Sequence, residues 1–230
     1  MRNREKKVIV FIAEGPSDEA ALGTIMKEFF IHEEIKFMVV HGDITTRDYV
    51  DTDAIIAKIN TCLESIKEKY RYEQEDFQKI IHLVDLDGVY VPDSCIKQAD
   101  VKKIKYHSDH IETNNVPGTI TRNHKKGQIL FKLRRTGKIN KIPYKVYYMS
   151  CNLEHVLYNE LAEYTDGEKE RMADEFAEMY EGKVDDFVQF ISNPLIAVAG
   201  NYQDTWKFIE RDFHSLNRYT NIHLVFDNKH

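Results

Sequence analysis

The sequence is poor in residues that break or crosslink a chain, and this scarcity excludes several classes of protein. Its 230 residues include 10 glycines, 5 prolines and 3 cysteines, so neither a low-complexity chain nor a disulfide scaffold is expected. The cysteines are scattered without a CxxC pair, which argues against a zinc ribbon and favours a reducing, cytoplasmic compartment. No window approaches about eighteen uncharged apolar residues, so we expect no transmembrane helix and no membrane partner.

Charge is distributed unevenly along the chain. The net charge is −6, yet residues 101–145 hold nine lysines and three arginines against only two acids. Because attraction to phosphate follows the local field rather than the net charge, this segment predicts a polyanion-binding surface. A solvated, lysine-rich loop explains the same composition equally well.

Apolar runs of strand length alternate with amphipathic segments in the first part of the chain. The pattern predicts strands at about 7–13, 35–40, 79–84 and 144–149, and helices at about 16–30, 53–70 and 153–161. This alternation is typical of parallel strands joined by right-handed crossovers. We therefore expect an α/β fold with a parallel sheet flanked by helices.

The connection between the third and fourth strands is long and basic. We interpret residues 89–143 as an insertion, in which 114–126 is rich in turns and 127–142 forms a hairpin that turns at Thr136-Gly137. Helical, mostly acidic segments follow the fourth strand. The expected organisation is an α/β core over residues 1–160, which carries the insertion, and a C-terminal helical subdomain over residues 161–230.

Carboxylates follow three of the four expected strands. Glu14-Gly15 comes after the first strand, Asp85-Leu86-Asp87-Gly88 after the third, and Glu154 just past the fourth. Because ligands bind at the carboxyl ends of parallel strands, these acids are expected to converge. Crowded carboxylates repel one another, and a hard divalent cation relieves that repulsion. Oxygen ligands without clustered His or Cys favour Mg²⁺ or Mn²⁺ over zinc.

The order of these acidic motifs resembles the TOPRIM domain of topoisomerases, primases, DNA-repair proteins and OLD-type nucleases. That family carries a Glu-Gly after its first strand and an Asp-x-Asp after its third, and the resemblance covers roughly residues 7–158. It implies a TOPRIM/Rossmann-like fold in which catalysis depends on Glu14, Asp85 and Asp87. The resemblance also implies that Asp18 and Glu154 complete the metal site, and that Lys207 takes the place of a late, charge-stabilising lysine.

Among the relatives with this domain, a nuclease needs the fewest additional parts. A topoisomerase would need a tyrosine-bearing domain and a primase a zinc-binding region, whereas a nuclease needs only acids, a cation and a grip on nucleic acid. The basic insertion offers phosphate contacts that read no sequence: Arg122, Lys125, Lys126, Lys132, Arg134 and Arg135. We therefore predict metal-dependent hydrolysis of DNA or RNA in phage defence or a mobile element. OLD-type nucleases commonly work beside an ATPase, which would here be a separate protein because the chain has no GxxxxGK[ST] loop.

Two other functions stay open at this point. The segment DLDGVYVPDS resembles the first motif of haloacid-dehalogenase-type phosphatases, in which Asp85 would be the nucleophile and Asp87 an acid/base. Two strand–helix units precede this motif and the later phosphatase motifs are missing, so the nuclease interpretation is preferred. The other possibility is a TOPRIM-like module that binds nucleic acid without cleaving it.

Several further residues are expected to have structural roles only. Glu19 is interpreted as a favourable charge at a helix start. His107 and His110 are three residues apart but lack a third ligand nearby, so they do not predict a zinc site. Tyr106 and Phe131 are expected to pack against the protein rather than to stack on nucleic-acid bases.

Overall fold

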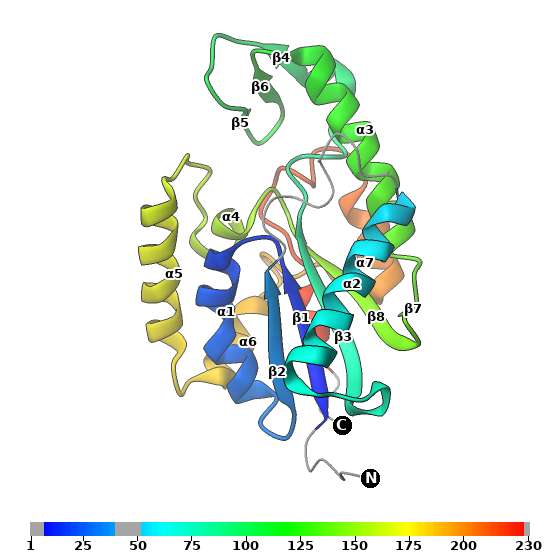
Figure 1. Cartoon of the computed structure of the whole chain (residues 1–230). Helices are drawn as coiled ribbons and strands as arrows, with labels where there is room; N and C mark the ends of the chain where they lie inside the picture. Colours follow the sequence, from blue (N-terminus) through cyan, green and yellow to red (C-terminus); the bar gives the residue numbers. More distant parts are fainter. Residues whose placement is uncertain (1–6, 40–51, 228–230) are drawn as a thin grey trace. The chain divides into compact units, whose positions relative to one another are not determined.

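A central, mostly parallel sheet flanked by helices organises the chain, as the α/β prediction requires (Figure 1). The computed structural model describes residues 7–39 and 52–227. Five strands form the sheet in the order β2-β1-β3-β8-β7. Their bounds are Val8–Ala13 (β1), Glu34–Val39 (β2), Phe77–Asp85 (β3), Lys138–Ile139 (β7) and Ile142–Met149 (β8). All four strands predicted from the sequence are therefore present, with ends shifted by one or two residues.

The first strand lies inside the sheet, between two neighbours, and it is apolar throughout. All six residues of β1 are buried, which is typical of a parallel strand covered on both faces. It pairs in parallel with β2 on one side and with β3 on the other. The register places Ile12 opposite Met38 of β2 and His82 of β3. This pairing aligns the carboxyl ends of β1 and β3.

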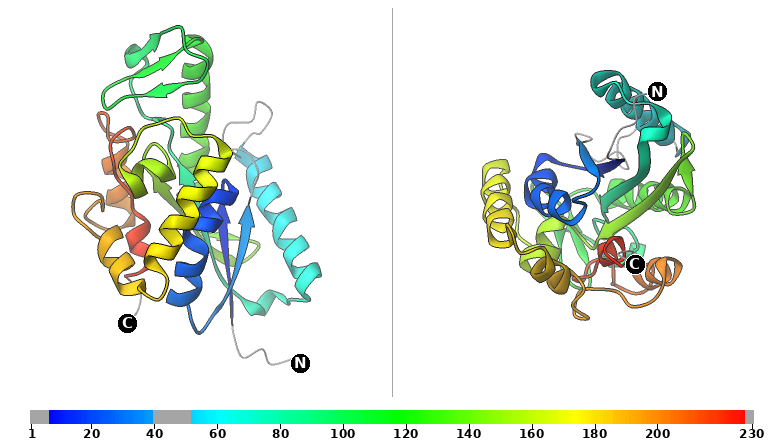
Figure 2. Two further views of the ribbon diagram at one scale, coloured as in Figure 1. Left: turned by 90° about the vertical axis from the view of Figure 1, so that its left-hand side faces the viewer. Right: turned by 90° about the horizontal axis from the view of Figure 1, so that it is seen from below.

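Two helices make the crossovers between these strands. Helix α1 (Pro16–Phe29) leads from β1 to β2, and α2 (Thr52–Tyr70) leads from β2 back past β1 to β3. Because right-handed crossovers in opposite directions use opposite faces, α1 and α2 flank the sheet from its two sides (Figures 1 and 2). Helix α5 (Asp166–Tyr180) packs alongside α1.

The basic insertion differs from its prediction. Where turns and a hairpin were expected, helix α3 extends from Val116 to Leu133. The backbone N–H of Gly118 donates to Oδ1 of Asn115, which caps the start of this helix. The actual hairpin joins β7 to β8, and its turn lies at Asn140 and Lys141, not at Thr136-Gly137. The prediction failed because the first part of α3 buries polar residues, Thr119, Asn123 and Lys126, and only its last part buries apolar ones.

The remaining part of the insertion forms a second, small sheet in the order β4-β6-β5. Its strands are β4 (Ile96–Gln98), β5 (Lys105–Tyr106) and β6 (Ile111–Thr113). Strand β6 pairs in parallel with β4 and antiparallel with β5. Val91, Ile96, Ile111 and Leu216 form the apolar cluster beneath this sheet.

The later part of the chain is helical, as expected. It contains α4 (Leu153–Tyr158), α5, α6 (Val184–Ile191) and α7 (Tyr202–Ile209). Short 3₁₀ turns lie at Gln74–Asp76, Asp93–Cys95 and Ile222–Val225. In the described residues, no helix has both the length and the apolar character needed to cross a membrane.

The chain forms two compact units that are both discontinuous in sequence. The first contains the segments up to residue 83, 129–146 and 166–184, and the second contains 84–128, 147–165 and 185 onward. Glu14 and Asp18 thus belong to the first unit, whereas Asp85, Asp87 and Glu154 belong to the second.

Candidate active site

The turn between β1 and α1 is built by local contacts in the first unit. Gly15 is the N-cap residue of α1 and Pro16 occupies the first helical turn, where its missing N–H costs nothing. Oδ2 of Asp18 accepts hydrogen bonds from the backbone N–H groups of Glu14 and Gly15, both at 3.0 Å. The predicted metal ligand Asp18 therefore has one oxygen committed to holding this turn.

Glu14 is half-buried at the end of β1, and its Oε1 atom is shielded from solvent. Glu19, one residue after Asp18, is exposed on the outer side of the same helical turn. The two glutamates flanking this turn are thus in different environments. Glu19 can therefore serve as a control for substitutions of Glu14, because it is the same residue type nearby in the sequence but its side chain is exposed.

The segment that follows β3 continues beside the segment that follows β8 in the second unit. Asp85 is the last residue of β3. The N–H of Leu86 donates to Met149 O at 3.0 Å, and the N–H of Asp87 donates to Cys151 O at 2.7 Å. These bonds fix the backbone of the Asp-x-Asp motif against the residues that lead into α4.

Asp87 and Gly88 both adopt the left-handed backbone conformation, with φ of 49° and 64°. Asp tolerates this region better than most residues, and glycine adopts it without steric cost. A Cβ atom on Gly88 would lie 2.6 Å from Leu216 Cδ2 and 2.9 Å from Ile111 Cδ1. Glycine is therefore required here for its backbone angles and for its lack of a side chain.

A buried ammonium group holds the side chain of Asp87. Lys126 Nζ lies 2.6 Å from Asp87 Oδ2, and the lysine side chain is fully buried whereas that of Asp87 is 23% exposed. The hydroxyl of Tyr106 donates to the other carboxylate oxygen at 3.3 Å. Arg122 donates to the carbonyl oxygen of Asp87 at 3.0 Å and to the Tyr106 hydroxyl oxygen at 3.1 Å. Asp87 is thus the centre of a network that no sequence motif indicated.

Two neighbours of Asp87 are kept in their neutral forms. Burial raises the pKa of Tyr106 far above neutrality, and the negative charge of Asp87 adds to this effect. Burial also raises the pKa of the Cys151 thiol, again with a contribution from Asp87. Tyr106 therefore serves as a hydrogen-bond donor, and Cys151 is a packing group rather than a thiolate nucleophile.

Helix α4 positions Glu154 and a neutral histidine. Oδ1 of Asn152 accepts from the N–H of His155 at 2.8 Å and caps the helix. Glu154 lies in the first turn and is only 4% exposed, where the positive end of the helix dipole favours its charge. Burial, with a smaller effect from Arg218, lowers the pKa of His155 to about 4.

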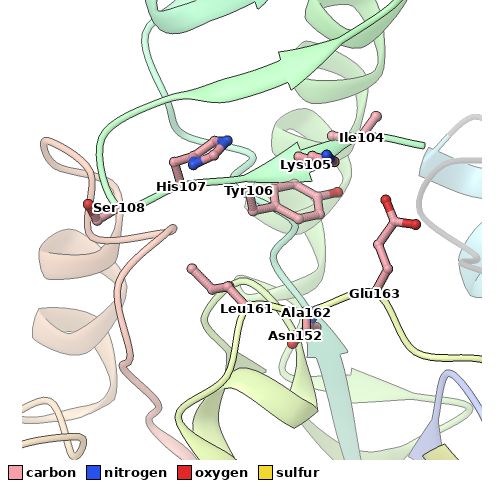
Figure 3. Close-up of a pocket in the computed structure, with 9 residues that line it drawn as sticks. All are labelled: Ile104, Lys105, Tyr106, His107, Ser108, Asn152, Leu161, Ala162 and Glu163. Atoms are coloured by element: carbon pink, nitrogen blue, oxygen red, sulfur yellow. The ribbon is translucent and has the colours of Figure 1, made fainter. Parts of the chain in front are cut away.

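A pocket of about 660 Å³ lies beside this network within the second unit. Tyr106 and His107 face Asn152, Leu161 and Ala162 across it (Figure 3). Its volume is within the range of small-molecule sites, about 300–1,000 Å³. Because Tyr106 both lines the pocket and donates to Asp87, the pocket adjoins the Asp-x-Asp motif.

The six predicted phosphate contacts fall into two groups. Arg122 and Lys126 turn inward and hold Asp87, as described above, while Lys125 is half-buried on α3. The others lie near the end of α3 in the first unit: Lys132, Arg134 and Arg135.

Phe131 contradicts the expectation that it packs inside the protein, since 47% of it is exposed. The guanidinium carbons of Arg134 and Arg135 lie 5.1 and 4.9 Å from its ring centroid. Arg134 and Arg135 follow Phe131 by three and four residues, about one helical turn, and the expected apolar alternation concealed that this ring faces solvent. The end of α3 therefore presents an exposed aromatic ring beside two cations.

Lys207 lies on α7 and is 61% exposed. It forms a surface ion pair with Asp204 at 3.1 Å, one helical turn away. This geometry adds no support to its predicted role beside the acids.

Comparison with known proteins yields no match to a family model, a curated protein or a solved structure. The function has to be inferred from the chemistry of the chain itself.

Proposed function

We propose that this chain is a TOPRIM-like, divalent-metal-dependent nuclease that hydrolyses phosphodiester bonds in DNA or RNA. The strand order is the observation that carries the proposal. Strand β3 ends at Asp85 and lies between β1, which Glu14 follows, and β8, which precedes Glu154. Three adjacent strands therefore lead to carboxylates.

The direction of the crossovers supports the same location. The chain moves from β1 outward to β2 and then returns past β1 to β3. In open α/β sheets, ligands bind at the carboxyl ends of the strands where the direction of the crossovers reverses. Glu14 and Asp85 belong to the two strands on either side of this reversal.

The donor chemistry fits a hard cation. The residues that would hold Mg²⁺ or Mn²⁺ are all carboxylates: Glu14, Asp85, Asp87, Asp18 and Glu154. A bound ion would supply an activated water and would stabilise the leaving oxygen of a phosphodiester. Lys126 engages Asp87, and the backbone amides at the start of α1 engage Asp18.

The residues at the exposed end of α3 support the proposal that the chain binds nucleic acid. Lys132, Arg134 and Arg135 would contact phosphates, and the exposed ring of Phe131 would stack on an unpaired base. Lys125 adds a further positive charge on the same helix. Arg122 and Lys126 act instead by positioning Asp87.

A cleavage assay with matched variants tests the proposal. Single- and double-stranded DNA and RNA would be incubated with Mg²⁺, Mn²⁺ or EDTA and with the wild type, Glu14→Gln, Asp85→Asn or Glu19→Gln. We expect Glu14→Gln and Asp85→Asn to slow cleavage by about 100-fold or more, in line with the loss of a group that stabilises transition-state charge. Glu19 lies in the first turn of α1, just after Glu14, and the Glu19→Gln variant should cleave at the wild-type rate.

Each alternative predicts a different result in the same assay. A phosphatase that uses Asp85 as its nucleophile would lose turnover of p-nitrophenyl phosphate in Asp85→Asn and keep it in Glu14→Gln. A protein that only binds nucleic acid would shift its mobility in a gel-shift assay but would not cleave it with Mg²⁺ or Mn²⁺. Cleavage that persists in EDTA or in both acid variants would contradict the metal mechanism.

A further inference from the structure

The turn between β5 and β6 brings together three residues with metal-binding side chains. Lys105 lies opposite Glu112 in the antiparallel register, and the N–H of His107 donates to His110 O at 3.0 Å to close the turn. One nitrogen from each of His107 and His110 and one carboxylate oxygen of Glu112 all lie within 4.8 Å of one another. The third ligand that the sequence analysis did not identify is therefore Glu112 on β6.

A carboxylate orients one of the two imidazoles. His110 Nδ1 lies 2.6 Å from Asp109 Oδ1, and an ionised carboxylate can only accept, so the ring donates from Nδ1. Its Nε2 atom then faces Glu112 Oε1 at 3.8 Å. In neutral His110, Nε2 is an acceptor facing another acceptor, an arrangement that a shared cation relieves. In metal sites, a ligating histidine usually donates from its other ring nitrogen to a carboxylate, which fixes the orientation of the ring.

The second imidazole faces the same carboxylate from a parallel position. The rings of His107 and His110 are stacked at 4.2 Å with an interplanar angle of 5°. His107 Nε2 lies 3.3 Å from Glu112 Oε2 and is shielded from solvent without a hydrogen bond. A buried nitrogen of this kind lacks the compensation that a hydrogen bond or a metal would provide. Both imidazoles thus direct an Nε2 atom toward Glu112.

We propose that His107, His110 and Glu112 form a Zn²⁺ site in the second unit. Two imidazoles and one carboxylate are a ligand set that zinc prefers over the harder Mg²⁺. Tetrahedral binding at about 2.0–2.1 Å places ligand atoms about 3.3–3.4 Å apart, so the three ligand atoms, which lie within 4.8 Å of one another, would move closer together around the ion. Three protein ligands leave a fourth position for water or an exchangeable ligand. Because His107 also lines the pocket, a bound ion would adjoin that pocket.

This site is independent of the proposed nuclease centre, because it shares none of the residues Glu14, Asp85, Asp87 or Glu154. Zinc binding can therefore be measured whether or not the chain cleaves nucleic acid. The probe is the metal alone, added to full-length protein that has been freed of metal with a chelator. Zn²⁺ binding would be followed by calorimetry, and Co²⁺ binding by its visible absorption.

We expect one equivalent of Zn²⁺ to bind the wild type and to be lost in His110→Ala. Glu112→Gln, which preserves the size of the side chain, should weaken binding by tenfold or more. Asp109→Asn should weaken it by about 10–100-fold, the usual effect of removing a second-shell partner. The fluorescence of Trp206, the single tryptophan and a buried residue of the same unit, would verify that each variant is folded.

Two controls make the assignment specific. His124→Ala removes an exposed histidine that pairs with Asp93 in the same unit, and it should bind zinc like the wild type. Asp85→Asn should also retain the full equivalent. Wild-type protein that binds no zinc, or unchanged binding in His110→Ala, would overturn the proposal. Loss of the equivalent in Asp85→Asn would overturn it as well, because the ion would then bind at the acidic motif.

Discussion

The acidic turns after β1 and β3 are positioned in opposite ways. After β1, Asp18 bonds to backbone N–H groups three and four residues before it in the sequence. After β3, Asp87 bonds to Tyr106 and Lys126, which are 19 and 39 residues away. The first turn is therefore set by local sequence, whereas the second depends on the folding of its whole unit.

This difference predicts how each turn responds to substitution. Loss of a local cap on backbone N–H groups costs about 0.5–2 kcal/mol. A buried ion pair is different, because removing one partner leaves the other charged and uncompensated in the interior. The β3 turn is therefore expected to be the more fragile of the two.

The largest effect is expected for Asp87→Asn. This change keeps the shape of the side chain and its tolerance of positive φ, but it removes the negative charge that lies 2.6 Å from the fully buried ammonium of Lys126. We expect the free energy of unfolding to fall by about 3–5 kcal/mol, measured in urea with the fluorescence of Trp206. The double variant Asp87→Asn/Lys126→Met should recover much of this loss. A single-variant loss below about 1 kcal/mol would contradict the contrast between the turns.

An intermediate effect is expected for Gly88→Ala. Its Cβ would combine the cost of a left-handed backbone, about 1–2 kcal/mol, with close contacts to Leu216 and Ile111 that cost about 1–3 kcal/mol. Gly182→Ala is the matched control, because Gly182 has φ of 68° and open space around it. The urea-unfolding difference between the two variants measures the packing cost alone. Equal losses would mean that Leu216 and Ile111 move aside freely.

The smallest effect is expected for Asp18→Ala. Loss of its two bonds to the backbone should lower stability by about 1 kcal/mol, and hydrogen exchange should report it as faster opening of the first turn of α1. Glu19→Ala changes the exposed neighbour and should shift stability by less than about 0.5 kcal/mol. If Asp18→Ala proved as harmful as Asp87→Asn, Asp18 would have a role beyond capping the turn.

The same contrast explains which features could be predicted from the sequence. Continuous apolar runs identified β1 and β3, and Glu14 and Asp85 were assigned to their ends because strand boundaries are local properties. Helix α3 was missed because the first part of its buried face carries Thr119, Asn123 and Lys126, so the apolar period of a helix is confined to its last part. Asn115 followed by Pro117 was a capping signal that could have indicated it.

The partners of the candidate site residues could not be predicted at all. Lys126 belongs to a run of basic residues, from which a solvent-exposed, phosphate-binding side chain is predicted. In the structure it is fully buried and pairs with Asp87. Glu112 joins His107 and His110 only because a tight turn pairs β5 with β6. Spacing along the chain contains no information about such pairings when the intervening elements are themselves misassigned.

The interleaving of the two units has a practical consequence for the study of this protein. The chain passes from one unit to the other at five points, and four of these lie within the continuous elements β3, α3, β8 and α6. Neither unit is a single continuous segment of the chain, so long deletions from either terminus would disrupt both units. Activities can be assigned to one half of this molecule only by single-residue changes.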